Sequence, residues 1–469
     1  MTFRCDTIAA ISTAMSDSGI GIIRVSGEDA ILIADKIFRS VNPDKKLINV
    51  KSHTVHYGFI YDGENLLDEV MVVVMKAPHS YTTEDTVEIN CHGGVFMVNR
   101  ILETVLKYGA RLAEPGEFTK RAFLNGRIDL SKAEAVIDII HSKNEFALKA
   151  GTAQLKGSVS NAVISMREKV LYEIAFIESA LDDPEHISLD GFKERISLSV
   201  QDLISQISKL IDSADNGKML KEGINTVILG KPNAGKSSLM NLLVGEEKAI
   251  VTSIAGTTRD ILEENIKLHG IGLNIIDTAG IRETEDVVEK IGVERAIKCA
   301  ENADLVIFVV DSSVLLDESD YAIMDFMKKK KSIVLLNKTD LEAVVTEETL
   351  REILLDKVGE VTENIPVIKT STKENIGMED FENQIKEMFF NGEISFNDEV
   401  YITNLRHKEA LIDARKSLLM VEKSIEDDMP EDFLSIDLMS AYASLGTIIG
   451  EEVGEDLVNE IFSKFCMGK

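Results

Sequence analysis

Apolar residues in the first part of the chain, up to about residue 119, occur in short runs separated by turn signals. Residues 20–25 and 70–75 are apolar runs of strand length, whereas residues 30–38 and 95–106 carry apolar residues at helical spacing. Strand and helix patterns are therefore interleaved over a length that suits one domain. The pattern predicts a compact α/β domain at residues 1–119.

The second part, residues 120–222, has the pattern of helices almost throughout. A long apolar stripe with helical spacing runs over residues 159–181, and no strand-like run interrupts it. A shorter stripe consists of Ala133, Val136, Ile137 and Ile140. Because a helix with one apolar face must cover that face, these helices are expected to need a partner from elsewhere in the chain.

The third part, residues 223–390, alternates between two patterns. Short apolar runs rich in β-branched residues lie at 226–229, 273–276, 305–310 and 333–336, and helical stretches separate them. This alternation is typical of a largely parallel sheet with helices on both faces.

The last part, residues 391–469, is helical again. Its two apolar stripes are Leu434, Leu438, Ala441, Leu445 and Ile448, and then Val453, Leu457 and Ile461. The simplest assembly packs these stripes against the helices before residue 222. We therefore predict one all-α helical domain made from both helical parts, with the α/β domain of residues 223–390 inserted into it.

The composition restricts the class of protein without identifying it. Hydrophobic residues make up 44% and charged residues 28%, as in globular proteins, and no apolar run approaches the ~18 residues of a membrane helix. The net charge of −29 argues against a broadly basic surface for nucleic acid, so any RNA contact would need a local patch. The four cysteines, Cys5, Cys91, Cys299 and Cys466, are too dispersed for a zinc motif or a disulfide framework. Reduced thiols and the lack of a secretion signal favour a cytoplasmic protein.

The strongest chemical signal is the segment from Gly230 to Ser237, which reads G-x-x-x-x-G-K-S between a predicted strand and a predicted helix. Its glycines let the backbone turn so that N–H groups point at phosphate oxygens, and the following helix adds its positive N-terminal end. Lys236 would supply a charge for the β and γ phosphates, and the Ser237 hydroxyl would bind Mg²⁺. This P-loop predicts a nucleoside triphosphate site.

Two later segments carry groups that would surround the γ-phosphate. Residues 277–280, D-T-A-G, close a predicted strand. Asp277 can hold Mg²⁺ through water, and the N–H of Gly280 can meet the γ-phosphate. Thr258, in the G-T-T-R-D segment of residues 256–260, is placed to complete the magnesium shell. Residues 252–260 are therefore predicted to form a switch segment that nucleotide orders.

The remaining two motifs suit guanine. Residues 337–340, N-K-T-D, end a later strand, and the carboxylate of Asp340 can accept two hydrogen bonds from guanine that adenine cannot donate. Residues 371–373, S-T-K, follow another apolar strand and suit a supporting loop. Four motifs in this order predict a Ras-like P-loop G domain. Its predicted GTP-binding residues are Asn233, Ala234, Gly235, Lys236, Ser237, Ser238, Thr252, Thr257, Thr258, Asp277, Thr278, Ala279, Gly280, Asn337, Lys338, Asp340, Ser371 and Lys373.

One catalytic group that Ras-like GTPases use is missing. They place a glutamine just after D-x-x-G to orient the attacking water, but this chain has Ile281 there. Hydrolysis therefore needs another residue to position water and another source of positive charge. The acidic candidates downstream are Glu283, Glu285, Asp286 and Glu289.

Over its full length the chain resembles the MnmE (TrmE) family of tRNA-modification GTPases. In the G domain the resemblance rests on G-K-P-N-A-G-K-S-S at 230–238, G-T-T-R-D at 256–260 and D-T-A-G-I-R at 277–282. Outside it, the matching segments are G-I-G-I-I-R-V-S-G at 19–27, H-G-G at 92–94, P-G-E-F-T-K-R-A-F-L-N-G at 115–126 and C-M-G-K at 466–469. The terminal C-x-G-K is the most discriminating, because ribosome-assembly GTPases share the P-loop motifs but lack that tail.

The resemblance implies a potassium-activated GTPase whose G domains dimerise across their nucleotide faces. By motif position, K⁺ would be held by Asn233, Thr252, Ile254 and Thr257, where an arginine finger would otherwise supply charge. The water-orienting glutamate would be Glu289. Both implications agree with the missing glutamine.

For the N-terminal domain, the resemblance implies a constitutive homodimer that binds 5-formyl- or 5,10-methylene-tetrahydrofolate. The matching folate positions are Arg24, Glu88, Arg127 and the C-terminal Lys469. Members of the family can carry lysine where this chain has Arg127, which keeps the charge but changes the donor geometry. Glu88 could accept hydrogen bonds from the pterin, and the cations could meet the carboxylates of the folate.

The resemblance further implies a reaction on tRNA. The chain would act in a heterotetramer with a flavoprotein partner of the MnmG (GidA) family. Together they would add a carboxymethylaminomethyl group to carbon 5 of the wobble uridine of certain tRNAs. FAD and NADH would belong to the partner, because no G-x-G-x-x-G fingerprint lies at a strand–helix junction here. Cys466 does not match a prenylation box, and the resemblance implies a catalytic or substrate-positioning role for it.

Two alternatives remain open. One is a ribosome-assembly GTPase that acts as a switch on rRNA, against which the N-terminal motifs and the tail argue. The other is a folate-dependent enzyme with a vestigial G domain. The residues that argue against it are Lys236, Ser237, Asp277, Asn337 and Asp340.

Overall fold

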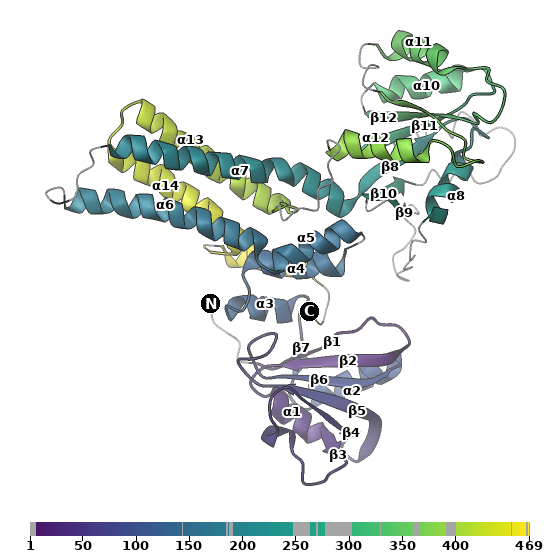
Figure 1. The fold of residues 1–469 in the computed structure, drawn as a ribbon. Helices are drawn as coiled ribbons and strands as arrows, with labels where there is room; N and C mark the ends of the chain where they lie inside the picture. Colours follow the sequence, from purple (N-terminus) through teal and green to yellow (C-terminus); the bar gives the residue numbers. More distant parts are fainter. Residues whose placement is uncertain are drawn as a thin grey trace. The chain divides into compact units, whose positions relative to one another are not determined.

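The computed structural model separates the chain into two compact units, drawn in Figure 1. The first unit consists of Met1–Ile140, Ala153–Ile204 and Asp413–Lys469, and the second of His141–Thr152 and Ser205–Ile412. The structure describes residues 6–142, 144–183, 186, 191–246, 263–268, 271–276, 303–328, 330–359, 365–390, 400–451, 453–465 and 468.

A seven-stranded sheet with the order β3-β4-β5-β6-β2-β1-β7 forms the N-terminal part of the first unit. The strands are β1 (Ile8–Ile11), β2 (Ser18–Ser26), β3 (Phe38–Ser40), β4 (Thr54–Asp62), β5 (Asn65–Met75), β6 (Thr86–Gly93) and β7 (Arg111–Leu112). Neighbours are antiparallel except β1 and β7, which are parallel. The predicted α/β character is therefore correct, and the strands at 20–25 and 70–75 lie within β2 and β5.

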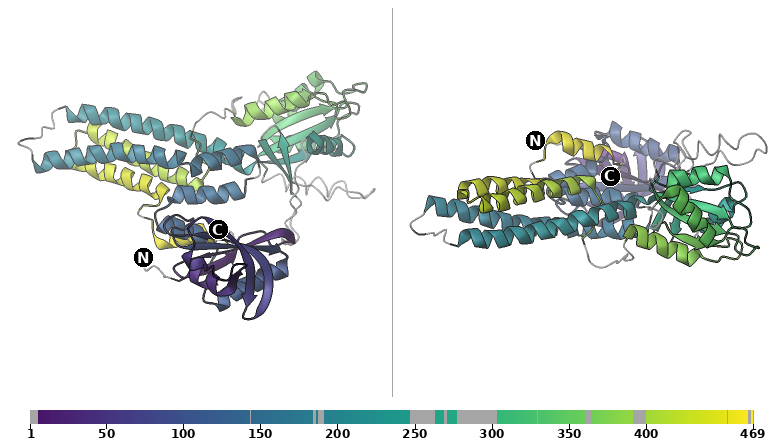
Figure 2. Two further views of the ribbon diagram at one scale, coloured as in Figure 1. Left: turned by 60° about the horizontal axis from the view of Figure 1, so that its bottom comes forward. Right: turned by 90° about the horizontal axis from the view of Figure 1, so that it is seen from above.

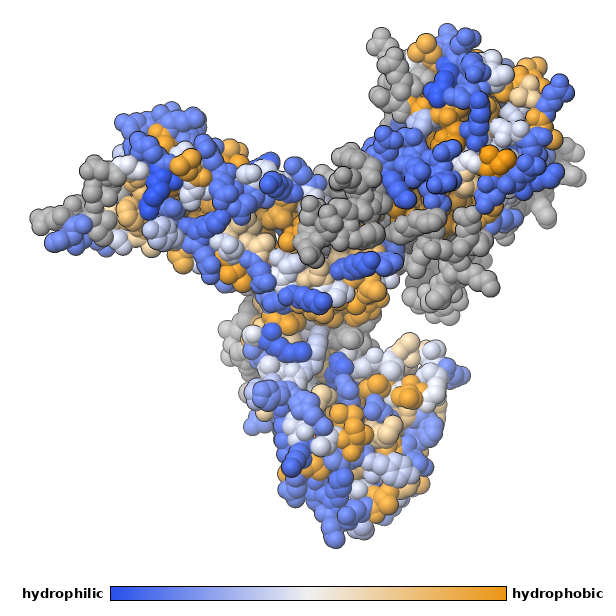
Figure 3. All heavy atoms as spheres, in the orientation of Figure 1, coloured by the Kyte–Doolittle hydropathy of each residue, from blue (hydrophilic) through white to orange (hydrophobic). Residues whose placement is uncertain are grey.

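The two faces of this sheet differ. Helices α1 (Ala30–Ile37) and α2 (Val95–Lys107) bury one face in a common apolar core. On the other face, α3 (Glu117–Leu124) packs Phe118 against β1, while apolar side chains of β4 and β5 remain exposed. Figure 3 shows apolar residues among polar ones on the surface of this domain.

Helices from both ends of the chain complete the first unit. They are α4 (Leu130–Ile140), α6 (Ser158–Asp182), α14 (Glu431–Ile449) and α15 (Glu455–Ser463), with parts of α7 (Phe192–Glu222) and α13 (Leu405–Glu426). The apolar stripe predicted on α14 is buried in full, and α14 packs along α6. The insertion of the G domain into a helical domain is thus confirmed.

Three predicted stripes are wrong at one position each. Ile140 and Leu181, at the ends of α4 and α6, are 43% and 42% exposed, and the third exception is in α15. In α15 the buried residues are Val458 and Phe462, whereas Leu457 is 39% exposed. Each buried residue lies one position after a predicted one, Val458 after Leu457 and Phe462 after Ile461. Phe462 packs on Phe123 and Phe465.

The second unit is built on a six-stranded sheet with the order β13-β12-β11-β8-β10-β9. The strands are β8 (Ile224–Leu229), β9 (Glu263–Leu268), β10 (Ile271–Ile276), β11 (Leu305–Asp311), β12 (Lys331–Asn337) and β13 (Val367–Lys369). All pairs are parallel except β9 with β10. The sequence pattern predicted all of these strands but β9, whose first three residues are polar.

Helices cover both faces of this second sheet, as predicted; Figure 2 gives two further views. On one face lie α8 (Lys236–Glu246), α12 (Met378–Phe390) and α5 (Glu145–Leu155), and on the other α10 (Glu318–Met327) and α11 (Glu347–Val358). This is a largely parallel sheet covered by helices on both faces. Among the residues that the structure describes, no helix is long and apolar enough to cross a membrane.

Candidate functional site

The P-loop connects β8 to α8 and depends on two glycines. Gly230 has φ +149° and Gly235 has φ +107°. A Cβ on Gly230 would collide with the carbonyl of Val309, and a Cβ on Gly235 would collide with the side-chain amide of Asn337. Glycine is therefore required twice, for its backbone conformation and for its close approach to neighbouring strands.

Lys236 points back into the loop that precedes it. Its Nζ donates hydrogen bonds to the carbonyls of Gly230 (2.6 Å) and Lys231 (2.5 Å). Burial lowers the pKa of Lys236 to about 8, because the ammonium loses hydration. A partly buried cation within a loop of backbone N–H groups, at the start of a helix, is an environment that stabilises an anion.

Asn337 links the P-loop to the loop after β13. Its Nδ2 donates to the carbonyl of Ala234 (2.8 Å), and its Oδ1 accepts from the backbone N–H of Thr372 (3.1 Å). Asn337 is fully buried. One side chain thus fixes the distance between the predicted phosphate loop and the predicted guanine loop.

The predicted guanine-binding residues also lie together. Ser371 donates from its Oγ to Oδ1 of Asp340 (2.8 Å), and the N–H of Glu374 donates to the same hydroxyl (3.3 Å). Lys338 has φ +63° and its ammonium pairs with Asp311 at the end of β11. Burial would raise the pKa of Asp311, but hydrogen bonds from Lys338 and Ser313 lower it.

Two of the four loops that the sequence predicted around GTP are therefore assembled next to the P-loop. Ser237 and Ser238 begin α8 and are exposed, as is Lys373. Outside the described residues lie the switch positions Thr252, Ile254, Thr257 and Thr258, the D-x-x-G residues Asp277, Thr278, Ala279 and Gly280, and Glu289.

A second group of predicted residues meets on the N-terminal sheet. Arg24 of β2 lies directly opposite Glu88 of β6, and Nη2 of Arg24 is 2.8 Å from Oε1 of Glu88. The guanidinium lies 5.6 Å from the ring centre of Tyr81 and 5.7 Å from that of Phe118. The ion pair is therefore flanked by aromatic rings, a setting that strengthens cation–π attraction.

The C-terminal tail reaches this ion pair. The carbonyl of Gly468 accepts hydrogen bonds from Nη1 of Arg24 (3.3 Å) and from the Oγ of Ser12 (3.2 Å). Cys466 and Lys469 lie outside the described residues, but their neighbour Gly468 is thus held beside Arg24 and Glu88.

Arg127 also contacts the Tyr81 ring. Its guanidinium lies 4.8 Å from the ring centre of Tyr81, and its Nη1 donates to the Tyr81 carbonyl (2.8 Å). A cavity of about 660 Å³ opens here. Its lining is His53, Met75, Pro78, His79, Ser80, Tyr81, Thr83, Asn125, Gly126 and Arg127.

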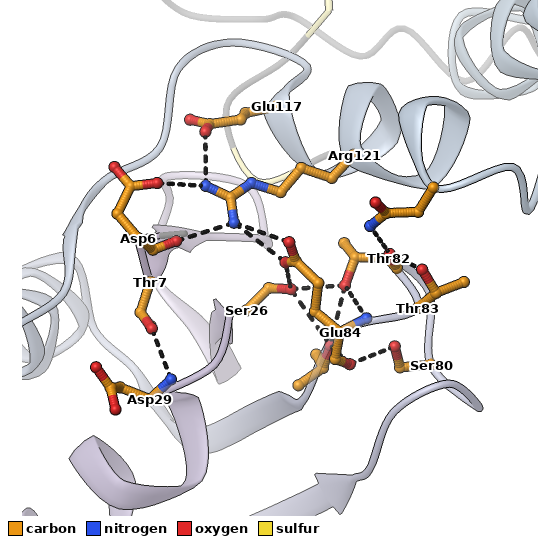
Figure 4. Close-up of polar contacts among 12 residues, drawn as sticks. Asp6, Thr7, Ser26, Asp29, Ser80, Thr82, Thr83, Glu84, Glu117 and Arg121 are labelled. Atoms are coloured by element: carbon orange, nitrogen blue, oxygen red, sulfur yellow. Dashed lines mark hydrogen bonds and ion pairs between the residues drawn. The ribbon is translucent and has the colours of Figure 1, made fainter. Parts of the chain in front are cut away.

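A buried polar network holds the segment that carries Tyr81, as Figure 4 shows. Arg121 of α3 pairs with Asp6 (3.0 Å), Glu84 (3.1 Å) and Glu117 (3.0 Å). Glu84 accepts from Ser26 (2.8 Å), whose hydroxyl is 2.6 Å from that of Thr82. The Tyr81 hydroxyl lies 2.9 Å from the Thr119 hydroxyl on α3.

Sequence reasoning missed Tyr81 and the Arg121 network. Tyr81 sits in a polar turn whose sequence gives it no periodic signal, and its partners lie at residues 24, 118, 119 and 127. Arg121 belongs to the P-G-E-F-T-K-R segment, which carried the resemblance but no assigned role. Among the described residues, no cluster of three or more His, Cys, Asp or Glu residues is arranged to bind a metal.

Comparison with known proteins gives matches over nearly the whole chain. The family model of the GTP-binding protein TrmE N-terminus matches residues 7–127, and that of the MnmE helical domain matches residues 130–466. The tRNA modification GTPase MnmE of Lachnoclostridium phytofermentans is 58% identical over 99% of this chain and 100% of that protein.

Further relatives carry the same description. The tRNA modification GTPase MnmE of Thermoanaerobacter pseudethanolicus is 48% identical, and that of Clostridioides difficile is 47% identical, each over 99% of both chains. Among solved structures, the G domain of the T. maritima FeoB iron transporter is 29% identical over 35% of this chain and 97% of that chain, with a TM-score of 0.24.

Proposed function

This chain belongs to the MnmE family of tRNA modification GTPases, and from that premise we propose that potassium activates its GTPase and that it modifies carbon 5 of wobble uridine. In this proposal a flavoprotein of the MnmG family is the partner, and a tetrahydrofolate supplies the one-carbon unit. The observation that carries the proposal is the meeting of the C-terminal tail with the Arg24–Glu88 pair, because it brings the tail that carries Cys466 to the proposed folate site.

The P-loop fits GTP with Mg²⁺, which the family uses. Gly230 and Gly235 let the loop pack closely against Val309 and Asn337, and Lys236 is a partly buried cation that suits an anionic partner. Lys236 would bind the phosphates, Ser237 and Thr258 would bind the magnesium ion, and Asp340 would select guanine. The metal would neutralise charge that develops on the phosphates.

Potassium would bind on the outer side of the same loop. Asn233 is exposed and has φ +62°, so its side-chain oxygen is available at the surface of the P-loop. The other proposed ligands, Thr252, Ile254 and Thr257, offer hydroxyl or carbonyl oxygens, which suit a hard monovalent cation. Glu289 would orient the water, since Ile281 has no group that can do so.

The cavity beside Tyr81 suits the proposed folate. Its volume of about 660 Å³ falls in the range of small-molecule sites. In its lining, Tyr81 offers a ring face and Arg127 a cation for carboxylates. Glu88, which pairs with Arg24 outside the lining, would offer an acceptor for the donors of a pterin. Lys469 would add a second cation, because its neighbour Gly468 is fixed beside Arg24.

The homodimer is proposed to form through the open face of the N-terminal sheet. Val55, Tyr57 and Met71 are 59%, 51% and 48% exposed and are cross-strand neighbours on β4 and β5. Register places Glu88 and Arg24 in the row that continues from Val55. A patch of apolar side chains at such positions marks an interaction surface.

GTP turnover in matched KCl and NaCl buffers tests the potassium model. We expect several-fold faster turnover in KCl, and an Asn233→Ala variant is expected to lose the difference between the salts. Equal rates in both salts for the unchanged protein would refute potassium activation.

Folate binding is tested by calorimetry with 5-formyl-tetrahydrofolate. Glu88→Gln and Arg127→Ala are expected to weaken binding about tenfold or more, each losing one charge-assisted hydrogen bond. Unchanged affinity in both variants would remove this site. Mass spectrometry of wobble uridines in cells that carry Cys466→Ser tests the role of the tail; normal modification would exclude a chemical role for Cys466.

A further inference from the structure

Lys231, the second residue of the P-loop, is fully engaged in contacts away from the loop. Its Nζ lies 2.6 Å from Oδ2 of Asp320, 2.8 Å from Oδ2 of Asp317, and 3.0 Å from the carbonyl of Leu315. An ammonium carries three protons, so these three oxygens use all of its donors. The side chain is only 20% exposed. Lys231 is therefore not available to a phosphate.

The two carboxylates that pair with Lys231 are also held by hydrogen bonds within the first turn of α10. Asp317 is the N-cap of α10 and accepts from the N–H of Ser319 (2.9 Å). Asp320 reaches back to the N–H of Asp317 (3.0 Å), which completes a capping box. Asp320 is 3% exposed, and burial raises its pKa. The start of α10 is thus a rigid acceptor for the lysine.

The backbone of Lys231 belongs to the phosphate loop itself. Its carbonyl accepts from Nζ of Lys236 (2.5 Å) and from the N–H of Ala234 (3.3 Å). At the other end of the turn, Asn337 holds the carbonyl of Ala234. The exposed residues Pro232 and Asn233 therefore lie between two anchor points, one of which is the side chain of Lys231.

We propose that Lys231 is a positioning residue that fastens the P-loop to the start of α10 and so holds the loop in the form that receives phosphate. Without its ammonium contacts, the carbonyl of Lys231 that orients Lys236 would lose its anchor, which opposes phosphate binding. The inference rests on the proposed GTP site.

The test measures release of a fluorescent GDP analogue from the full-length protein in Mg²⁺, after addition of excess unlabelled GDP. Lys231→Met is expected to speed release by about tenfold, which corresponds to about 1.4 kcal/mol. Lys231→Arg, which keeps the charge, is expected to restore slow release in part. The matched control is Lys328→Met, which removes a lysine that pairs with Asp325 (2.7 Å) beside the other end of α10, and it is expected to leave release unchanged.

A double-variant cycle distinguishes fastening from general destabilisation. Asp317→Asn alone is expected to speed release, but to add little in the Lys231→Met background, because both changes break the same contact. Additive effects, or release at the unchanged rate in Lys231→Met, would overturn the proposal. A Lys236→Ala variant tests the GTP site independently of the role of Lys231. Loss of nucleotide binding in that variant would support the GTP site, whereas normal binding would refute it.

Discussion

Among single residues, Gly468 lets the C-terminal tail pack closely against β1 because it has no side chain. Its φ is +89°, and a Cβ would collide with the carbonyl of Ile11. Gly468→Ala should therefore lift the tail from β1 and displace the carbonyl that Arg24 and Ser12 hold. We expect wobble-uridine modification in cells to fall at least several-fold while GTP turnover of the purified protein stays unchanged.

The matched control for that change is Gly454→Ala. Gly454 also lies in the C-terminal segment, but a Cβ there would meet no atom within 4 Å. Modification, measured by mass spectrometry of tRNA nucleosides, should be normal in this control. Normal modification in Gly468→Ala as well would show that the docked tail is not needed.

The lowered pKa of Lys236 predicts that the protein takes up protons when it binds Mg²⁺–GDP at alkaline pH. Its pKa of about 8 follows from burial, and a bound diphosphate would favour the charged form and raise that pKa again. At about pH 8.5, Mg²⁺–GDP binding should therefore take up a fraction of a proton, and at about pH 7 almost none, since free Lys236 is then already charged. Calorimetry in two buffers of different ionisation enthalpy measures the uptake. Binding heats that do not depend on the buffer at about pH 8.5 would contradict it.

The residues that the sequence could identify are those whose role depends on neighbours along the chain. The P-loop glycines and Lys236 act within eight consecutive residues, and the structure places them with Asn337 and Asp340 at one edge of the sheet. Tyr81 could not be identified in this way. It gains its role only when folding brings Arg24, Phe118 and Arg127 around it. The roles assigned to individual residues remain predictions until variants are measured.

Between elements, the Arg121 network joins α3 to the N-terminal chain and to the segment before β6. Arg121 is 10% exposed and Glu117 is 9% exposed. Arg121→Met would leave the carboxylates of Asp6, Glu84 and Glu117 without this partner. Such a change typically costs about 3 kcal/mol, which should appear in denaturant unfolding at neutral pH.

The same network predicts the direction of the acid dependence. Burial alone would raise the pKa values of Asp6 and Glu117, but hydrogen bonds from Arg111 and Arg121 lower them below the ordinary 3.8 and 4.5. The two carboxylates therefore stabilise the folded protein at any pH above their ordinary pKa values. This stabilisation is lost as the pH falls through their lowered pKa values in the folded protein. Arg121→Met should lose less further stability on acidification than the unchanged protein.

Lys169→Met provides the control for both measurements. Lys169 pairs with Asp202 at 2.8 Å, but the two side chains are 40% and 56% exposed. Exposed pairs contribute at most about 1 kcal/mol. An Arg121→Met protein as stable as this control, or one with the acid dependence of the unchanged protein, would show that the network contributes little.

Helices and strands with a regular pattern of apolar residues were predicted well, and those with an irregular pattern were not. The stripe of α14 is buried at every predicted position because an isolated helix face needs only one partner, here α6. Strand β9, at the edge of the sheet, was missed because its first three residues are polar and only Ile266 and Leu268 are apolar. In α15 the buried face is shifted by one residue, to Val458 and Phe462, because Phe462 packs on Phe123, which lies more than three hundred residues earlier.

For the whole chain, the order of domains followed from pattern changes, but the exact borders depend on packing. The predicted limits of 1–119, 120–222, 223–390 and 391–469 remain predictions. The compact units divide α7 and α13 between them, and they place residues 141–152 with the G domain. Phe146 explains the latter, because it packs edge-on against Tyr401 and joins the core of the G-domain sheet. A sequence pattern cannot show which of two domains a short helix joins.

Assembly of two copies is the remaining question at this scale. On the open face of the N-terminal sheet, Tyr57 and Met71 are direct cross-strand partners, both about half exposed. Met71→Asp would place a charge at the centre of a surface that the dimer would dehydrate, which typically costs several kcal/mol. We therefore expect this variant to elute as a monomer in light-scattering chromatography.

The control is Phe96→Asp on α2, in the same domain. Phe96 is 82% exposed, more than Met71, but α2 covers the opposite face of the sheet. Both variants therefore replace an exposed apolar residue with aspartate, and they differ in the face of the sheet on which that residue lies. If dimerisation uses the open face, Met71→Asp should be monomeric and Phe96→Asp dimeric. Dimers in both variants would exclude the open face, and monomers in Phe96→Asp alone would assign the interface to the helical side.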